Sequence, residues 1–310
     1  MKIGALYTGN KEREKLLSGL SIIIPAFNEE DGIGHVLEHL SKIMSQVDFK
    51  CEIIVVDDGS QDGTYEKAKQ YDNIVLLRNN VNRGYGASIK RGIRSARYDL
   101  ICITDADATY PNEDIPKLID KIKTENADMV VGARIGKNVN IPLVRRPAKW
   151  VLQKVANLVS GQYIPDLNSG LRVFKKSVAM QFLSVLPNGF SFTTTITLAL
   201  LTNGFYVEYI PINYHARIGN SKIRPMRDTI NFLQLILRIA LYFAPLKIFL
   251  PISGLLMLLG IFWGIFSKFV LGRFADTSTL IIVTSSIEVL VVGLLAELID
   301  RRMPGYYKEE

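Results

Sequence analysis

The sequence predicts an α/β protein in which a mostly parallel sheet, covered by helices, is followed by amphipathic helices and two membrane-spanning helices. Three features of the 310-residue chain support this prediction. Short apolar segments alternate with helical patterns from residue 21 to residue 130, several of these segments end in polar residues, and two long apolar runs lie near the C-terminus. Strands that alternate with helices are typical of parallel sheets buried on both faces.

Five segments are expected to form strands: SIIIPAF (21–27), CEIIVVDDGS (51–60), NIVLLRN (73–79), LICITDAD (100–107) and ADMVVGAR (127–134). An amphipathic helix that carries Val36, Leu37 and Leu40 on one face separates the first two. Parallel sheets bind ligands at the carboxyl ends of their strands. The polar residues at these ends are Asn28, Glu29, Asp57, Asp58, Asp105, Asp107 and Arg134.

Two carboxylates, Asp105 and Asp107, follow the apolar run Leu100–Ile103 with one residue between them. On a strand end these side chains point the same way, so they repel each other unless a cation or a proton compensates. Their hard oxygen atoms suit Mg²⁺ or Mn²⁺ bridged to an anionic ligand. The alternative is that one of them caps the helix predicted to open near Pro111.

Other phosphate-binding motifs are incomplete. Gly84-Tyr85-Gly86 lacks the third glycine of a dinucleotide fingerprint, and Gly132–Lys137 is one residue short of a P-loop and lacks its Ser or Thr. The sequence therefore argues against a dehydrogenase and against a P-loop enzyme.

Two apolar runs are long enough to cross a bilayer. Ile248–Phe266 contains no charged residue, and Thr279–Ile299 contains only Glu288 and Glu297. A buried helical hairpin of a soluble domain is the alternative. Because Met1–Leu20 is charged and lacks the apolar segment of a signal peptide, we expect these runs to be C-terminal anchors.

The expected orientation follows from the basic residues beside the two spans. Those at the outer ends are Lys247, Arg301, Arg302 and Lys308, against Lys268 and Arg273 in the link. This balance favours an integral membrane protein with its N-terminal domain and its C-terminus in the cytoplasm.

Two amphipathic segments are expected to lie on the membrane surface. In residues 142–161, apolar residues including Trp150 alternate with basic ones, and residues 227–244 directly precede the first span. A basic helix docked on a protein core is the alternative for residues 142–161.

Charge and cysteine content narrow the possible partners. The net charge of +7 indicates a polyanionic partner, and the predicted spans favour anionic lipid over nucleic acid. Cys51 and Cys102 lie in apolar runs and are expected to be reduced, as in a cytosolic domain.

Three further charged or titratable features are assigned to structure. Glu288 lies within a span, where it is costly unless paired, so we expect it to face a partner helix or subunit in a possible homo-oligomer. Glu297 is expected to pair with Arg301. His35 and His39 are four residues apart without an evident third metal ligand, which predicts a solvated helix face.

The motifs SIIIPAFNEE, VVDDGSQDGT, NRGYGASIKRG and TDADATYP, in this order, resemble the family-2 glycosyltransferases of the GT-A fold, which is a Rossmann-like, mostly parallel sheet. The resemblance covers about Ser21 to Ile223. The segments DLNSGLRVFKK and YHARIGNSK and the two terminal helices are similar to polyprenol-phosphate sugar transferases, such as dolichol-phosphate mannose synthase and its bacterial glucosyl relatives.

The resemblance implies roles for individual residues. Pro25, Phe27, Asn28 and Glu29 would line the nucleotide pocket, Asp57 or Asp58 would hold the base, and Lys90 would lie nearby. Asp105 and Asp107 would bind Mg²⁺ or Mn²⁺, which holds the diphosphate of the donor. Many relatives have Gln where this chain has Thr109, whose hydroxyl is expected to contact metal or water.

The acceptor is expected to be held by cations, because a phosphate monoester is already anionic and needs no strong base. Candidates are Arg134, Arg145, Arg146, Arg217 and Lys222, of which Arg134 and Arg217 belong to the resembling motifs. Each also has a simpler interpretation as a solvated charge. Asp166 is expected to orient a sugar hydroxyl or the acceptor, or alternatively to be a turn residue before Asn168. Asp105, Asp107, Asp166, Arg134 and Arg217 are the predicted catalytic set.

The predicted function is transfer of a hexose from a nucleotide-sugar of the UDP-glucose or GDP-mannose type to a polyprenyl phosphate, with inversion. The domains would be 1–226 (GT-A), 227–244 (juxtamembrane helix), 245–300 (anchor) and 301–310 (cytoplasmic tail). Three alternatives stay open: a processive synthase, although no Q-x-x-R-W follows Gln234; an anchored transferase with another glycolipid or a soluble acceptor; and a non-catalytic membrane scaffold.

Overall fold

The computed structural model describes residues 19–47, 49–135, 146–215, 241, 245–270, 272 and 275–302. They form two compact units. The first takes its described residues from the ranges Met1–Arg146 and Ile164–Arg224. The second takes them from Pro147–Tyr163 and Pro225–Glu310.

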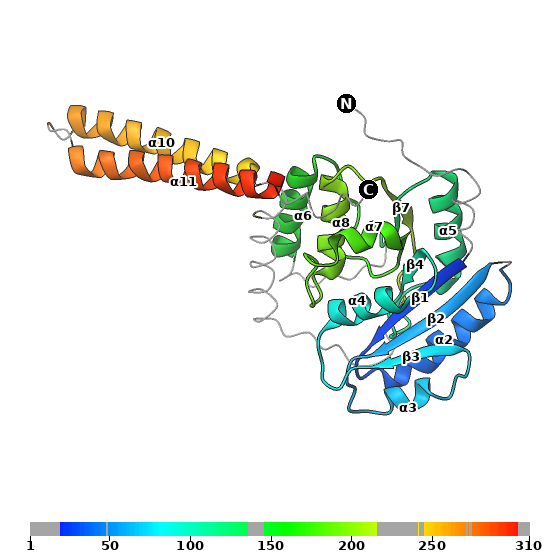
Figure 1. Cartoon of the computed structure of the whole chain (residues 1–310). Coiled ribbons are helices and arrows are strands. Elements are labelled where there is room, and N and C mark those ends of the chain that lie inside the picture. The colour runs from blue at the N-terminus through cyan, green and yellow to red at the C-terminus, as the bar shows by residue number, and fades with distance from the viewer. Residues whose placement is uncertain are drawn as a thin grey trace. The chain divides into compact units, whose positions relative to one another are not determined.

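A sheet forms the centre of the first unit (Figure 1). It has seven strands in the order β3-β2-β1-β4-β6-β5-β7. Its strands are β1 (Gly19–Ala26), β2 (Lys50–Asp57), β3 (Ile74–Arg78), β4 (Leu100–Ile103), β5 (Met129–Ala133), β6 (Arg172–Lys175) and β7 (Val207–Pro211). All neighbouring strands are parallel except β6, which runs antiparallel to β4 and β5. The predicted α/β class with a mostly parallel sheet is confirmed.

Helices cover both faces of this sheet. They are α2 (Glu30–Met44), α3 (Thr64–Ala68), α4 (Tyr85–Ser95), the 3₁₀ turn η1 (Asn112–Asp114), α5 (Ile115–Thr124), α7 (Lys176–Phe182) and α8 (Phe192–Thr202). Alternate residues of β1 point to opposite faces. Ile22 shares a core with Leu37 of α2 and Leu118 of α5, whereas Ile23 lies against Gly92 of α4.

The carboxyl ends of β1, β2 and β4 are aligned at one edge of the sheet. Ala26 pairs with Asp57, and Ile23 pairs with Ile103. The ladder continues just beyond the strands, because the N–H of Asp58 donates to the carbonyl of Ala26 over 2.8 Å. The two predicted acidic segments are therefore held on either side of the end of β1.

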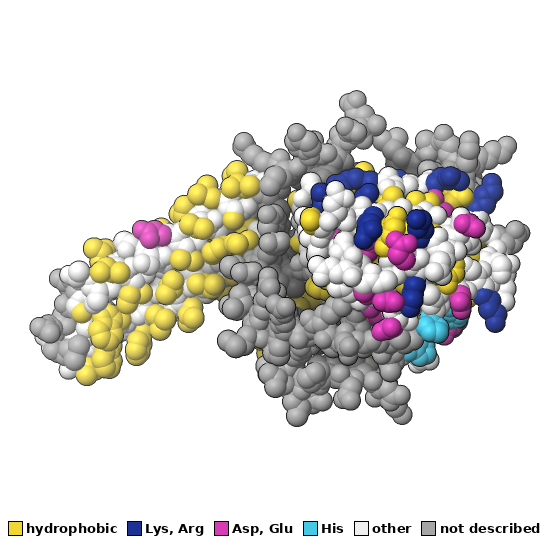
Figure 2. Space-filling view, turned by 90° about the horizontal axis from the view of Figure 1, so that it is seen from below, with side chains coloured by type: hydrophobic (Ala, Val, Ile, Leu, Met, Phe, Trp, Pro, Cys, Tyr) yellow, Lys and Arg dark blue, Asp and Glu magenta, His cyan; other side chains and the backbone are white. Residues whose placement is uncertain are grey.

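The second unit contains α6 (Arg146–Ser160) and two long helices, α10 (Pro245–Val270) and α11 (Asp276–Arg302). Both long helices are long and apolar enough to cross a membrane, and an 18-residue stretch of each has a mean hydropathy of 2.2. Few of their residues are buried, and Figure 2 shows apolar side chains over the visible face of the hairpin. This exposure is typical of helices that face lipid and is unlike the alternative of a soluble core.

Small residues let α10 and α11 pack closely. A Cβ atom added to Gly260 would lie 2.9 Å from Val283, and one added to Gly293 would lie 2.5 Å from Phe249. Such small residues are characteristic of helix contacts in membranes. Both expected spans lie within these two helices.

Helix α6 is the described part of the amphipathic segment predicted at residues 142–161. It clusters with the hairpin unit, and the Lys247 ammonium donates to the carbonyl oxygens of Leu158 and Val159 at its C-terminal end. Trp150 is exposed, whereas Leu152 is buried. Of the second predicted segment, residues 227–244, only Leu241 lies within the described residues.

Candidate active site at the carboxyl ends of the sheet

The segment after β1 is fastened to the segment after β2 by short hydrogen bonds. The Asn28 N–H donates to Ser60 Oγ over 2.9 Å, and Asn28 Oδ1 accepts from the Gln61 N–H over 2.8 Å. The Glu29 N–H donates to Thr64 Oγ1 over 2.8 Å. Asn28 adopts a left-handed conformation with φ of 51°, which asparagine tolerates better than most residues. Pro25 and Phe27 flank the same turn, so the residues predicted to line a nucleotide pocket lie together.

The two acidic residues that end β2 have different surroundings. Asp58 accepts hydrogen bonds from Asn79 Nδ2 and from the N–H groups of Arg83 and Gly84, at 2.6, 3.0 and 2.8 Å. Asp57 is buried, and its Oδ2 lies 3.2 Å from Arg78 Nε without a hydrogen-bond partner. Asp58 therefore holds the loop that precedes α4, while Asp57 keeps an oxygen with hydrogen-bonding capacity.

The carboxylate pair after β4 lies in a tightly packed loop. The Tyr85 hydroxyl donates to Asp105 Oδ1 over 3.0 Å, and a Cβ atom on Gly170 would lie 3.0 Å from Asp105 Oδ2. Burial and the neighbouring Asp105 carboxylate raise the pKa of Tyr85 well above its ordinary value, so this phenol stays a donor. Gly32 of α2 packs against the backbone of this loop, where a Cβ atom would lie 2.5 Å from the Ala106 carbonyl.

Thr109, whose hydroxyl is expected to contact metal or water, contacts Asp107 in this structure. Its hydroxyl donates to Asp107 Oδ1 over 2.6 Å, and its N–H donates to the same atom over 3.2 Å. Thr109 is buried, and Ala108 before it has a positive φ of 58°. The strained turn and the two hydrogen bonds orient the Asp107 carboxylate.

The residues after β4 fit a hard divalent cation only in part. Asp105 and Asp107 supply the oxygen ligands that Mg²⁺ and Mn²⁺ prefer. In the part of the chain that the structure describes, no three His, Cys, Asp or Glu side chains form a metal cluster. A cation held by these two carboxylates would therefore complete its coordination with water or with oxygens of an anionic ligand.

Arg134 and Asp166, both predicted as catalytic residues, form an ion pair with each other. Arg134 Nε donates to Asp166 Oδ2 over 2.7 Å, and NH2 donates to Oδ1 over 3.0 Å. The Arg134 backbone N–H also donates to Oδ2, and NH2 reaches Asn168 Oδ1. Burial lowers the pKa of Arg134, but the hydrogen bonds to Asp166 outweigh it and leave this pKa raised. Arg134 is therefore not the solvated charge that was its alternative interpretation, and Asp166 also accepts from the Asn168 N–H, as a turn residue would.

Two tyrosines connect this ion pair with the acidic loop. The Tyr214 ring lies 5.4 Å from the Arg134 guanidinium and meets the Tyr110 ring edge to face at 5.4 Å. The Tyr110 hydroxyl accepts a 2.6 Å hydrogen bond from the Gly170 N–H, beside Asp105. Burial raises the pKa of Tyr110, so it stays protonated.

Arg172 was not among the residues predicted from the sequence, although it lies within the segment DLNSGLRVFKK. Its side chain is fully buried, and Nε and NH2 donate to the Ser169 carbonyl. NH1 donates to the Thr193 carbonyl and to Thr197 Oγ1, over 2.9 and 3.0 Å. Burial lowers the pKa of Arg172. This arginine joins the loop beside Asp105 to α8, and an arginine directly before the apolar pair Val173 and Phe174 was the available signal.

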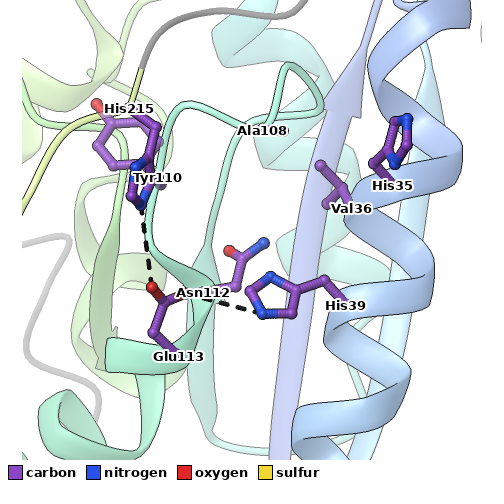
Figure 3. A pocket seen from close by; sticks show the side chains of 8 residues that line it. All are labelled: His35, Val36, His39, Ala108, Tyr110, Asn112, Glu113 and His215. Carbon is purple, nitrogen blue, oxygen red and sulfur yellow. Dashed lines mark ion pairs between the residues drawn. The ribbon is translucent and has the colours of Figure 1, made fainter.

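All three histidines of the chain line one pocket beside the acidic loop (Figure 3). Glu113 lies between His39 and His215, 3.9 Å from Nε2 of each. The pocket has a volume of about 290 Å³, and Ala108 and Tyr110 form part of its wall. His35 and His39 were predicted to be a solvated helix face, and the described residues form no metal cluster there.

The remaining predicted cations are only partly described. Lys90 Nζ donates to Asn188 Oδ1 over 2.9 Å, and burial together with Arg94 lowers the pKa of Lys90. Arg145, Arg217 and Lys222 lie outside the described residues. Arg146 begins α6, but its side chain is not among those described.

Two family models match the chain. The model for glycosyl transferase family 2 matches residues 21–183, which is more than half of the chain. The model for the GtrB C-terminal hairpin matches residues 244–301, which contain most of α10 and α11. This match and the two apolar helices indicate a membrane protein.

Curated relatives and solved structures agree with these matches. The chain is 27% identical to the dodecaprenyl-phosphate galacturonate synthase of Rhizobium johnstonii, over 94% of this chain and 89% of that protein. It is 28% identical to the dolichyl-phosphate hexose transferase of Haloferax volcanii, over 68% of this chain and 90% of that protein. The same fold is found in glucosyl-3-phosphoglycerate synthase of Mycobacterium tuberculosis, which was solved with Mn²⁺, UDP-glucose and phosphoglyceric acid. The TM-score is 0.57 at 18% sequence identity, and the match covers 77% of this chain and 86% of that chain.

Proposed function

Because the chain belongs to glycosyl transferase family 2, we propose that it transfers a hexose from a nucleotide-sugar to a polyprenyl phosphate at a membrane surface. The named activities of the relatives from Rhizobium johnstonii and Haloferax volcanii support this acceptor class. The donor would be of the UDP-glucose or GDP-mannose type.

The observation that carries the proposal is an acidic loop that lies near a partly buried arginine, in a chain that also has an apolar helical hairpin. Asp105 and Asp107 lie at the carboxyl end of β4, and the Arg134–Asp166 pair follows β5. Tyr110 and Tyr214 link the two parts of the site. A donor diphosphate needs compensation of its negative charge, an acceptor phosphate needs cationic donors, and a polyprenyl chain needs a nearby membrane.

The donor would bind where the ends of β1 and β2 are tied together. Pro25, Phe27, Asn28 and Glu29 would line this place, and Lys90 would lie near the nucleotide. Of the two acids after β2, Asp57 is the better candidate to hold the base, because its Oδ2 lacks a hydrogen bond while Asp58 has three donors. A base that reached Asp57 would have to displace Arg78.

Asp105 and Asp107 would hold Mg²⁺ or Mn²⁺, which when bound would stabilise the leaving diphosphate. The protein's own contribution is to fix the two carboxylates. Tyr85 donates to Asp105 and Thr109 donates to Asp107, so neither carboxylate has to be reoriented when the donor arrives.

The acceptor phosphate is its own nucleophile. Because it is anionic at neutral pH, the site needs no free general base, and the engagement of Asp166 with Arg134 is compatible with that. Arg134 NH1 has no acceptor among the described residues and would be available to a phosphate oxygen. Arg145, Arg146, Arg217 and Lys222 are proposed to add further cations. A single displacement would invert the configuration at the anomeric carbon.

The remaining predictions concern the membrane. We propose that residues 142–161 and 227–244 lie at its surface, that residues 245–300 are the anchor, and that the catalytic domain (1–226) and the tail (301–310) face the cytoplasm. Glu288 is exposed on α11, and a second copy of the chain is its proposed neighbour.

The test is transfer of labelled sugar from a panel of UDP- and GDP-hexoses into the organic phase, with a polyprenyl phosphate and Mg²⁺ or Mn²⁺. Label in lipid that disappears with EDTA and in Asp107→Ala would support the function and identify the sugar. Transfer to a soluble phosphate ester, with none to polyprenyl phosphate, would favour the anchored enzyme with a soluble acceptor.

A further inference from the structure

An exposed aromatic side chain lies beside the candidate metal ligands. Phe190 has 84% of its surface exposed, more than any other large hydrophobic side chain among the described residues. Its ring stacks on the Tyr85 ring, with 5.5 Å between centroids and 18° between planes. Tyr85 in turn donates to Asp105. The stacked pair Tyr85 and Phe190, called here the aromatic platform, therefore begins at Asp105 and ends in solvent.

The backbone holds this platform in place. The Asn188 carbonyl accepts a 3.0 Å hydrogen bond from the Ala87 N–H. Gly84 and Gly86 allow this close approach, because a Cβ atom on Gly84 would lie 2.5 Å from the Asn188 carbonyl oxygen and one on Gly86 would lie 2.2 Å from that of Pro187. Phe190 is thus presented to solvent by a loop that is fastened to the first turn of α4.

Packing does not explain the exposure of Phe190. Two residues later, Phe192 is fully buried at the start of α8, so the chain places one phenylalanine in the core and turns the other outward. An exposed aromatic side chain at the edge of a polar site is characteristic of a contact surface for a ligand.

Two polar groups beside the platform, the Tyr85 hydroxyl and the Lys90 ammonium, already donate hydrogen bonds within the protein. The Tyr85 hydroxyl donates to Asp105 Oδ1, and the Lys90 ammonium donates to Asn188 Oδ1. A hexose ring needs partners for its hydroxyl groups, whereas a hydrocarbon needs only an apolar surface. The platform therefore fits hydrocarbon better than sugar.

We propose that the aromatic platform binds the first isoprene units of the polyprenyl phosphate acceptor. This inference rests on the proposed function, because it assigns the lipid part of that acceptor to named residues. The phosphate has to come close to the donor held at Asp105, so the hydrocarbon attached to it leaves the site beside Tyr85 and Phe190. Phe190 is then a specificity-determining residue for the acceptor.

The first experiment compares the wild-type chain with Phe190→Ala and Phe190→Leu, using farnesyl phosphate and a long polyprenyl phosphate as acceptors. Loss of one aromatic contact is worth about a 3- to 10-fold change in binding. We expect the acceptor KM to rise by about this factor in Phe190→Ala and less in Phe190→Leu, with an unchanged donor KM. Met180→Ala is the matched control, because Met180 is an exposed apolar residue on α7.

A second experiment detects the lipid without turnover. The emission of Phe190→Trp should shift to shorter wavelength when farnesyl phosphate is added and should not shift with inorganic phosphate. A rise in donor KM alone, or unchanged constants for both substrates, would overturn the assignment. If the wild-type chain transfers sugar only to non-lipid acceptors, the proposed function itself fails, and this result is separate from any effect of Phe190.

Discussion

Replacement of Arg134 by alanine separates two roles for this residue, as a phosphate ligand and as half of a buried ion pair. The side chains of Arg134 and Asp166 are 17% and 5% exposed. Arg134→Ala would leave the Asp166 carboxylate buried without its cation, which typically costs about 3–5 kcal/mol. Since about 1 kcal/mol corresponds to roughly 2–4 °C in a domain of this size, we expect the melting temperature to fall by about 10 °C.

The assay is differential scanning fluorimetry of the full chain in detergent, combined with steady-state kinetics below the melting transition. Lys175→Ala is the matched control, because Lys175 and Asp128 form a partly buried ion pair, 15% and 16% exposed, where β6 ends and β5 begins. Both variants should lose stability, but only Arg134→Ala should raise the acceptor KM. An unchanged melting temperature with a raised acceptor KM would refute the structural role of the pair, and equal kinetic losses in both variants would refute the role toward the acceptor.

Three further predictions concern other parts of the chain. Thr109→Val removes the hydroxyl that orients Asp107 and should raise the Mn²⁺ concentration for half-maximal activity about tenfold. The melting temperature should stay within a few degrees of wild type. An unchanged Mn²⁺ requirement would count against the role of Thr109 in orienting Asp107. Burial, followed by the charge of Glu52, raises the pKa of Cys51 to about 12, so iodoacetamide at pH 8 should leave this thiol unmodified. The contribution of the protonated Cys51 thiol to the free energy of unfolding should be complete below about pH 9 and should fall as the pH rises toward 12. Rapid labelling of the native protein, seen by mass spectrometry, would contradict the burial of Cys51. Glu288→Leu should weaken self-association measured by cross-linking in nanodiscs if this acid contacts a second copy, and an unchanged oligomer distribution would remove that role.

The sequence predicted those parts of the fold that depend on local pattern. Leu100–Ile103 is apolar, short and followed by acids, and it forms a fully buried strand whose end carries Asp105. The expected spans could be identified for the same reason, since an uninterrupted apolar run of this length is typical of a helix that crosses a membrane. In contrast, the four residues of β6 carry too little pattern to identify a strand, and its antiparallel direction depends on pairing with β4 and β5.

The site was predicted as a set of residues but not as a set of contacts. Arg134 and Asp166 are 32 residues apart, and only the fold brings them within 2.7 Å. The same is true of Tyr85 and Asp105. A motif identifies which side chains gather at the end of a sheet, whereas the partner of each charge is decided by long-range packing that a single sequence does not contain.

The ion pair also changes how the acceptor has to be held. An arginine that already donates to a carboxylate from Nε and NH2 brings little net positive charge to an incoming phosphate. What it offers is direction, because the planar guanidinium is fixed and its NH1 edge has no acceptor among the described residues. The net attraction for a phosphate must then come from other cations. The candidates that the sequence provides are Arg145, Arg146, Arg217 and Lys222. On this argument Arg134 positions the acceptor, while the other predicted cations supply the charge.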